Sequence, residues 1–157
     1  MPKPKEGVLA PSINAIDQNG DKITLSQFKG DSAVVLYFYP KDNTPGCTVE
    51  ACEFQAAKRK FTNAKAIVIG VSPDAPKSHI KFIEKFGLKF SLISDEDKSV
   101  CKAYGTWIKK SMYGREYMGV ARSTFIINKQ GKITKIFEKV KAKGHAEEVL
   151  LALKNEK

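Results

Sequence analysis

The feature that most constrains this chain is a buried strand that stops at a proline and leads directly into a helix bearing a cysteine. Residues 33–39 form an uninterrupted run of apolar and β-prone side chains, and Pro40 cannot continue a central ladder of hydrogen bonds. Thr44 is a suitable N-cap, and Pro45 suits the first helical position because its missing N–H has no partner to lose there. Cys47 is therefore predicted to be the third residue of a helix.

The predicted position of Cys47 is chemically unusual for a thiol. Backbone N–H groups in the first turn of a helix have no intrahelical partner, and the helix dipole favours a negative charge there. For a cysteine the favoured anion is the thiolate, which is the nucleophilic form. The alternative is that Cys47 is a small buried apolar side chain, as free cysteines often are. Its place at the helix start favours a reactive centre.

A second cysteine, Cys52, follows on the same predicted helix. Residues five apart in an α-helix are rotated by about 140° and lie about 8.7 Å apart at Cα. A disulfide needs a Cα separation of roughly 4.4 to 6.8 Å. If Cys47 and Cys52 form a disulfide, the first turns of the helix must therefore unwind. The sequence also leaves open that Cys52 is a core residue without a redox role.

Arg122 is the third candidate for the site. It is one of only three arginines among 27 basic residues, and it immediately precedes an apolar strand over residues 123–127. A guanidinium carries a fixed charge and a planar fork of donors, which would stabilise a thiolate and the charge that develops on a departing oxygen. The alternative is an ordinary surface salt bridge.

Three segments together resemble a known family, the peroxiredoxins of the Q type, also called the bacterioferritin comigratory protein group of the thiol-specific antioxidant family. The first is Tyr39-Pro40, the second is the nine-residue stretch 44–52 (TPGCTVEAC), and the third is the stretch 119–127 (GVARSTFII). The resemblance covers the chain from about residue 7 to residue 153.

The resemblance implies a thiol-specific peroxidase, an atypical 2-Cys peroxiredoxin acting in antioxidant defence and redox homeostasis. Such an enzyme reduces hydrogen peroxide and organic hydroperoxides through a Cys47 sulfenic acid and an intramolecular Cys47–Cys52 disulfide that thioredoxin reduces. In the family the residue matching Thr44 hydrogen-bonds the thiolate and the peroxide, and the one matching Pro40 shields the sulfur from water. Glu50 is expected to help hold the active-site turn. The resemblance also implies a monomeric enzyme that needs no metal, haem or flavin.

Alternating polar and apolar residues predict an N-terminal β-hairpin over residues 12–17 and 22–25, with a turn between them. The apolar run 66–72 predicts a parallel central strand, and residues 123–127 and 133–137 predict a second hairpin. The element order resembles an α/β thioredoxin-like fold with a central mixed β-sheet flanked by helices. Because repeats and linkers are absent, a single domain over residues 1–157 is expected.

The helices follow from the same patterns. The helix that bears Cys47 is predicted to run from Pro45 to about Phe61, and a second helix is predicted over residues 76–86. Ile80, Ile83 and Phe86 recur every three residues and are predicted to form the apolar face of that second helix. Residues 109–119 are polar and contain glycine, so we expect an irregular hairpin or excursion. A short helix through Cys101 and a C-terminal helix over residues 144–153 complete the prediction.

Charge and cysteine usage argue against several classes of function. The net charge is +10, but 24 of the 27 basic residues are lysines spread along the chain, which is typical of a solvated surface and argues against a nucleic-acid partner. His79 and His145 do not fall at ligand spacings from the cysteines, so no metal site is expected. Cys101 lies on an apolar helical face and is interpreted as structural.

The N-terminal ten residues lack the apolar core of a secretory signal, and no segment is long enough to span a bilayer, so a cytoplasmic location without membrane contact is expected. Two alternatives to a peroxidase remain at this stage. A thioredoxin-like disulfide reductase would require Cys-x-x-Cys, which the chain lacks. A binding or holdase protein would carry these cysteines incidentally.

Overall fold

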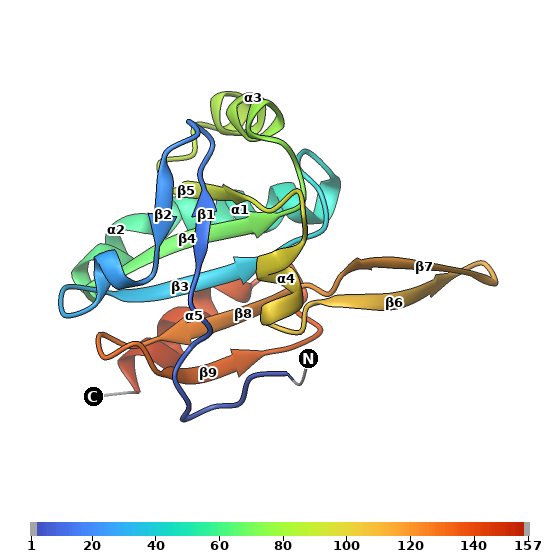
Figure 1. Cartoon of the computed structure of the whole chain (residues 1–157). Helices are drawn as coiled ribbons and strands as arrows, with labels where there is room; N and C mark the ends of the chain where they lie inside the picture. Colours follow the sequence, from blue (N-terminus) through green and yellow to red (C-terminus); the bar gives the residue numbers. More distant parts are fainter. Residues whose placement is uncertain (1–2, 156–157) are drawn as a thin grey trace.

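A seven-stranded mixed sheet forms the centre of the computed structural model, which describes residues 3–155 (Figure 1). Its strands are β1 (Asn14–Ile16), β2 (Lys22–Thr24), β3 (Ala33–Phe38), β4 (Ala66–Ser72), β5 (Ser91–Ser94), β8 (Ser123–Ile127) and β9 (Ile133–Phe137). They lie in the order β2-β1-β5-β4-β3-β8-β9. Strands β3, β4 and β5 are parallel, whereas β1 and β8 join them antiparallel. The predicted mixed sheet and the N-terminal β1–β2 hairpin are both confirmed.

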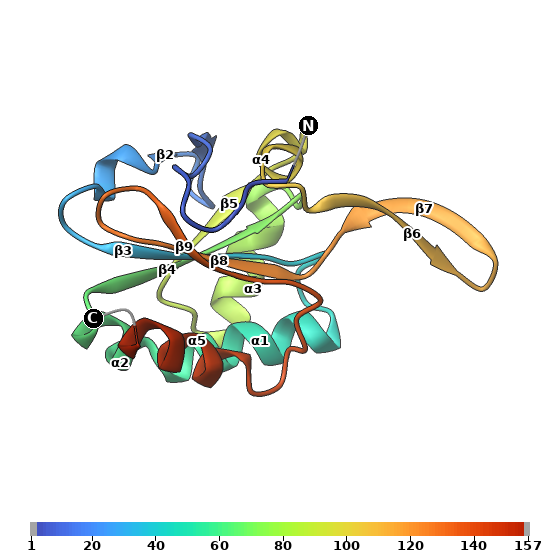
Figure 2. The same ribbon diagram turned by 90° about the horizontal axis from the view of Figure 1, so that it is seen from below.

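Helices cover the two faces of this sheet unequally (Figure 2). The elements packed on one face are α1 (Pro45–Ala56), α2 (Lys58–Asn63), α3 (Pro76–Phe86) and α5 (His145–Lys154). The other face carries the short helix α4 (Ser99–Ala103), the 3-10 helix η1 (Ser26–Phe28) and the N-terminal segment. Among residues 3–155, no helix combines the length and the apolar character needed to cross a membrane.

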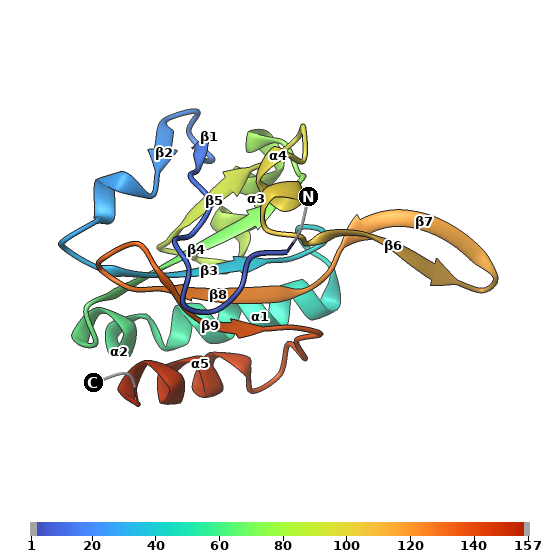
Figure 3. The same cartoon turned by 60° about the horizontal axis from the view of Figure 1, so that its bottom comes forward.

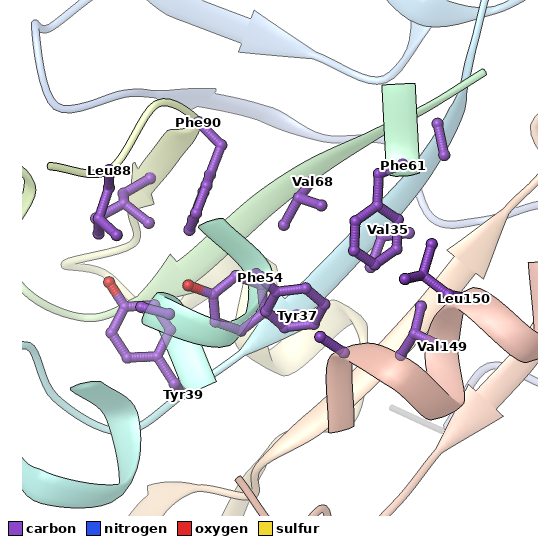
Figure 4. Close-up of a cluster of buried hydrophobic side chains, with 14 of the residues drawn as sticks. Val35, Tyr37, Tyr39, Phe54, Phe61, Val68, Leu88, Phe90, Val149 and Leu150 are labelled. Carbon is purple, nitrogen blue, oxygen red and sulfur yellow. The ribbon is translucent and has the colours of Figure 1, made fainter. Parts of the chain in front are cut away.

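The alternation of side chains along β3 divides the core into two layers. Val35, Tyr37 and Tyr39 point toward α1 and α5, and the residues between them point toward α4. Both sets are buried, which explains why the strand is one continuous apolar run. In the first layer the rings of Tyr37 and Phe54 lie 4.7 Å apart between centroids, and the hydroxyls of Tyr37 and Tyr39 point to the same side (Figure 4).

The single helix predicted from Pro45 to Phe61 is wrong in one respect, because the chain divides it at Ala57. The backbone of Ala57 has φ −93° and ψ 4°, and it separates α1 from α2. Residues seven apart in a straight helix are about 10.5 Å apart along its axis. The rings of Phe54 and Phe61 are only 5.7 Å apart between centroids, so tertiary packing of this pair accompanies the break.

The bounds predicted for α3 are confirmed, since it spans Pro76–Phe86 and ends at Gly87, whose φ of +64° is left-handed. The prediction of its apolar face is partly wrong. The fully buried side chains are His79 and Phe82, whereas Ile80 is 37% exposed. Polar partners inside the protein account for the burial of His79, and a pattern based on apolar side chains could not detect them.

Residues 107–120 form a regular hairpin rather than the irregular excursion that the sequence suggests. Strands β6 (Trp107–Met112) and β7 (Arg115–Val120) pair with each other and project from one end of the central sheet (Figure 3). Tyr113 and Gly114 connect them with φ values of 54° and 75°. Two positive φ values suit the right-handed twist of a hairpin, but tyrosine is an uncommon residue at the first of these positions.

Candidate active site

Strand register brings the two sequence-predicted halves of the site together. Strand β3 pairs antiparallel with β8, and Phe38 faces Ser123 in that register. Arg122 therefore lies beside the loop that follows β3 and leads to Cys47 at the start of α1. Figure 1 shows the start of α1 and the junction between β7 and β8 at the same end of the sheet.

Arg122 contacts both Cys47 and a carboxylate on the same helix. Its Nη2 donates a hydrogen bond to the Cys47 Sγ at 3.3 Å, and its Nη1 donates to the Glu50 Oε1 at 2.6 Å. The Arg122 side chain is 18% exposed and that of Glu50 is fully buried. Cys47 itself is 2% exposed. The guanidinium is therefore a fixed cation in contact with a buried sulfur. The alternative that Arg122 forms an ordinary surface salt bridge does not fit this burial.

Gly46 makes this close approach possible. A Cβ built on Gly46 would lie 3.1 Å from the Arg122 Nη2. That separation is tighter than ordinary van der Waals contact, so a larger residue would push the guanidinium away from the first turn of α1. The glycine of the Thr-Pro-Gly-Cys turn thus serves the placement of Arg122 over Cys47.

Glu50 is a buried carboxyl whose charge depends on pH near neutrality. Burial raises the pKa of Glu50 to about 7, although the adjacent Arg122 guanidinium acts in the opposite direction. Its Oε1 accepts the bond from Arg122, and its Oε2 has no hydrogen-bond partner among the described residues. For Arg122, burial lowers the pKa, but Glu50 and Cys47 outweigh this effect and raise it. Arg122 therefore remains charged.

Thr44 occupies the N-cap position of α1, but its hydroxyl does not cap the helix. Its backbone is extended, with φ −94° and ψ 157°, and the first helical bond runs from the Thr48 N–H to the Thr44 carbonyl at 2.8 Å. The hydroxyl donates to the Lys41 carbonyl at 2.9 Å instead. Thr44 is thus the N-cap residue as predicted, but its side chain bonds to the loop before the helix and makes no capping hydrogen bond. The expected contact of Thr44 with thiolate and peroxide stays a prediction.

Pro40 lies half-buried in the bend that follows β3, where it ends the strand as predicted. The last backbone hydrogen bond to β4 runs from the Tyr39 N–H to the Val71 carbonyl at 3.0 Å. The expected shielding of the sulfur by Pro40 stays a prediction.

Cys52 is a free, half-buried thiol on the intact helix α1, five residues after Cys47. The two thiols therefore lie on different sides of the helix, about 8.7 Å apart at Cα by ideal helix geometry. A disulfide between Cys47 and Cys52 therefore requires α1 to unwind.

Cys101 lies fully buried in α4, outside this site. Burial raises the pKa of the Cys101 thiol, and the negative charge of Asp95 raises it further. The Asp95 carboxylate also accepts the backbone N–H of Cys101 at 2.8 Å. These surroundings keep the thiol protonated and support its interpretation as a structural residue.

Lys110 is a second cation that the sequence analysis did not find. Its side chain runs from β6 over Gly119, where a built Cβ would lie 3.3 Å from the Lys110 Cδ. Burial lowers the pKa of Lys110, and the charge of Arg122 lowers it further, while Cys47 acts in the opposite direction. Lys110 is thus electrostatically coupled to the site, and only the hairpin pairing of β6 with β7 could reveal it.

A second polar cluster in the described chain could hold a metal ion by spacing alone. Ligand atoms of Asp42, Asp74 and His79 lie within 4.8 Å of one another. Both ring nitrogens of His79 are already engaged, one with Asp42 and one with the Ile93 carbonyl. A ring with both nitrogens in protein hydrogen bonds has no lone pair free for a metal, so the cluster fits a hydrogen-bond network better.

Known proteins resemble this chain over most of its length. The model of the AhpC/TSA family matches residues 7–136. The chain is 49% identical to a putative peroxiredoxin bcp of Helicobacter pylori, over 98% of this chain and 100% of the relative. It is 45% identical to peroxiredoxin Bcp of Bacillus subtilis, over 95% and 94% of the two chains.

Solved structures give the same result. The bacterioferritin comigratory protein of Xanthomonas campestris, described for its alkyl peroxide reduction activity, aligns with a TM-score of 0.90 at 38% identity, over 97% of this chain and 99% of that one. Peroxidoxin BcpB of Mycobacterium tuberculosis aligns with a TM-score of 0.86 at 32% identity, over 98% of each chain. The predicted thioredoxin-like fold is confirmed by these neighbours.

Proposed function

Because the chain belongs to the AhpC/TSA family and is a thiol-dependent peroxidase, we propose that Cys47 is its peroxide-reducing thiol and that Cys52 resolves the oxidised product. The observation that carries this assignment is the contact of the buried Cys47 Sγ with the Arg122 guanidinium at 3.3 Å. A cation in contact with the sulfur favours its ionised, nucleophilic form.

In the first step the Cys47 thiolate attacks the terminal oxygen of the hydroperoxide. The S–O bond forms as the O–O bond breaks, and the departing alkoxide or hydroxide takes a proton to leave as alcohol or water. Cys47 becomes a sulfenic acid. Charge moves from the sulfur to the leaving oxygen in this step, so a donor fork that contacts the sulfur is placed to stabilise both.

Glu50 supports this step through Arg122. Its carboxylate accepts Nη1 at 2.6 Å, which leaves Nη2 directed at Cys47. Thr44 and Pro40 flank the same turn, and we assign them the roles that the family suggests, contact with the peroxide and exclusion of water. Glu50 acts on the reaction by positioning the guanidinium.

In the second step Cys52 attacks the Cys47 sulfenic acid, a disulfide forms and water leaves. The helix α1 must unwind for the two sulfurs to meet. An external dithiol protein then reduces the disulfide through a mixed disulfide and becomes oxidised itself, which closes the cycle. We propose thioredoxin as this reductant, with hydrogen peroxide and organic hydroperoxides as substrates.

The remaining assignments follow from this cycle. Both reacting thiols lie on one helix, so the cycle requires no second chain and we propose a monomer. We place the enzyme in the cytoplasm, where thiol reductants keep such cysteines reduced between turnovers. We propose one domain for the whole chain, although residues 1–2 and 156–157 of the predicted range 1–157 lie outside the described residues.

The disulfide provides the direct test of this cycle. Mass spectrometry of the peroxide-treated protein is expected to find a link between Cys47 and Cys52, with Cys101 excluded. Amide exchange over residues 45–54 is expected to rise sharply on oxidation, since α1 must open. Cys52→Ser should reduce one equivalent of peroxide and then stall as a sulfenic acid. A dominant link from Cys47 to Cys101 or to another chain, or a helix that stays protected when oxidised, would contradict the mechanism.

A further inference from the structure

A buried polar network surrounds Asp42, five residues before Cys47 in the loop that leads into α1. Asp42 is 7% exposed, and His79 of α3 is fully buried. The Asp42 Oδ2 lies 2.7 Å from the His79 Nδ1, and the His79 Nε2 lies 3.0 Å from the Ile93 carbonyl oxygen. The catalytic cycle described above assigns no role to either residue.

Hydrogen bonds satisfy every polar side-chain atom of this pair. A carbonyl oxygen only accepts, so the His79 Nε2 must carry a proton. The Asp42 Oδ1 accepts the Tyr39 hydroxyl at 2.5 Å, and the Oδ2 accepts the Ser78 hydroxyl at 2.8 Å. The bond between the His79 Nδ1 and the Asp42 Oδ2 is satisfied by one proton, carried by either atom. The contacts therefore describe a buried Asp42–His79 pair whose polar side-chain atoms are all hydrogen-bonded.

The backbone of the same loop is held as well. The Asp42 N–H donates to the Asp74 Oδ2 at 2.8 Å, and that oxygen also accepts the Ser72 hydroxyl at 2.8 Å. These partners lie at the end of β4 and just beyond it. The loop is thus held by its side chain and its backbone to elements that do not belong to α1.

The residue after Asp42 shows that this loop has a demanding conformation. Asn43 has φ +59°, in the left-handed region that non-glycine residues seldom adopt. Such a residue persists where the surrounding structure fixes it. Asn43 lies between Asp42 and Thr44, the N-cap of α1, so the network fixes the direction in which the chain enters the helix.

We propose that Asp42 and His79 are positioning residues whose buried pair holds the entrance of α1 in its folded conformation and thereby sets how readily α1 unwinds for disulfide formation. This inference rests on the proposed cycle, in which Cys47 and Cys52 meet only after α1 opens. Removing one member of a buried, hydrogen-bonded pair is destabilising, because the polar group of the other member is left without a partner. Weakening the pair raises the population of the unwound form.

The test separates the two steps of the cycle in His79→Gln and in the milder Ser78→Ala, which removes one hydrogen bond to Asp42. Tyr104→Phe is the matched control, because it removes a buried hydrogen bond to the Pro11 carbonyl on the opposite face of the sheet. Peroxide consumption by the reduced protein measures the first step. Acid quenching, thiol alkylation and mass spectrometry measure formation of the Cys47–Cys52 disulfide.

We expect His79→Gln to form the disulfide about tenfold faster. This factor corresponds to a fall of about 1.4 kcal/mol in the free energy needed to unwind α1. The first step should be unchanged or slower. Since disulfide formation competes with a second oxidation by peroxide, the sulfinic form of Cys47 should accumulate less at high peroxide concentration. Ser78→Ala should shift both readouts in the same directions by a smaller factor. Tyr104→Phe should leave them within twofold of wild type.

Three outcomes would overturn the proposal. The first is a disulfide rate and a sulfinic fraction within twofold of wild type in Ser78→Ala and in folded His79→Gln. The second is a change of equal size in Tyr104→Phe, which would indicate a general loss of stability. The third is a change in the wild-type rates after dialysis against EDTA, which would indicate a metal at Asp42, Asp74 and His79. Failure of the cycle itself is distinguishable, because the wild type would then show no Cys47–Cys52 link.

Discussion

Cys47 and Cys101 are both buried free thiols, 2% and 0% exposed, yet their surroundings are electrostatically opposite. Cys47 lies at the start of α1 against the guanidinium of Arg122. Cys101 lies in α4 beside the carboxylate of Asp95, which with burial raises its pKa. Burial by itself disfavours a thiolate, so a contacting cation, and not accessibility, distinguishes the thiol proposed to react with peroxide from the thiol interpreted as structural.

The strongest test of this comparison replaces each thiol. Cys47→Ser is expected to abolish peroxide turnover, because a serine hydroxyl does not ionise at neutral pH. Cys101→Ala should keep turnover within twofold and lose about 1 kcal/mol of stability from the small cavity it leaves. Coupled peroxidase assays and urea unfolding measure the two effects. Substantial turnover in Cys47→Ser, or its loss in folded Cys101→Ala, would reverse the roles of the two residues.

The next test removes the donor fork while keeping the charge. Arg122→Lys keeps the charge but loses the planar fork whose two nitrogens contact Cys47 and Glu50, and we expect a fall of about 100- to 1,000-fold in the second-order rate with peroxide. Alkylation of Cys47 by iodoacetamide at neutral pH should slow as well. Arg115→Lys, at the exposed start of β7, is the matched control and should change neither rate. Equal rates in the two variants would show that the fork has no part in catalysis.

A third test concerns Glu50, the buried carboxyl that bonds to Arg122 beside Cys47. The folded protein holds the proton of Glu50 up to about pH 7, whereas the unfolded chain releases it near its ordinary value of 4.5. Between these values the folded state binds more protons, so this group lowers the free energy of unfolding as pH rises. Glu50→Gln should therefore gain up to about 3 kcal/mol relative to wild type between pH 4.5 and pH 8.

Urea unfolding of the reduced proteins at pH 5 and pH 8 measures this difference. Glu147→Gln, which removes an exposed carboxylate in the first turn of α5, is the control. The stability of that control relative to wild type should change little between the two pH values. A pH dependence of Glu50→Gln that matches the control would mean that Glu50 ionises normally in the folded protein.

The smallest effect is expected at Asp95. Asp95→Asn removes the negative charge beside Cys101 but leaves the thiol buried, and burial is the larger cause of its raised pKa. The pKa of Cys101 should fall without making the residue reactive at neutral pH. Labelling of the native variant by a thiol reagent at pH 7, with Cys47 and Cys52 already blocked, should still leave Cys101 unmodified. Rapid labelling would show that charge outweighs burial at this position.

Local sequence patterns predict the strand that stops before Pro40, the start of α1 at Pro45 and the place of Cys47 in its first turn, and the structure has all three. The same patterns also indicate that Cys47 and Cys52 cannot meet on an intact helix. These conclusions depend on backbone geometry within a short segment, where proline, helix capping and the helical repeat act locally. The resemblance to the peroxiredoxins rests on the same segment and on the stretch around Arg122.

The contacts between distant residues come from the tertiary fold and could not be predicted from local patterns. Register between β3 and β8 brings Arg122 to Cys47, and the pairing of β6 with β7 places Lys110 where the charges of Arg122 and Cys47 affect its pKa. The structure also buries His79, which the apolar pattern of α3 did not indicate, because its partners Asp42 and Ile93 come from other elements. Contacts between segments far apart in the chain depend on register and packing, and neither leaves a periodic signal in one segment.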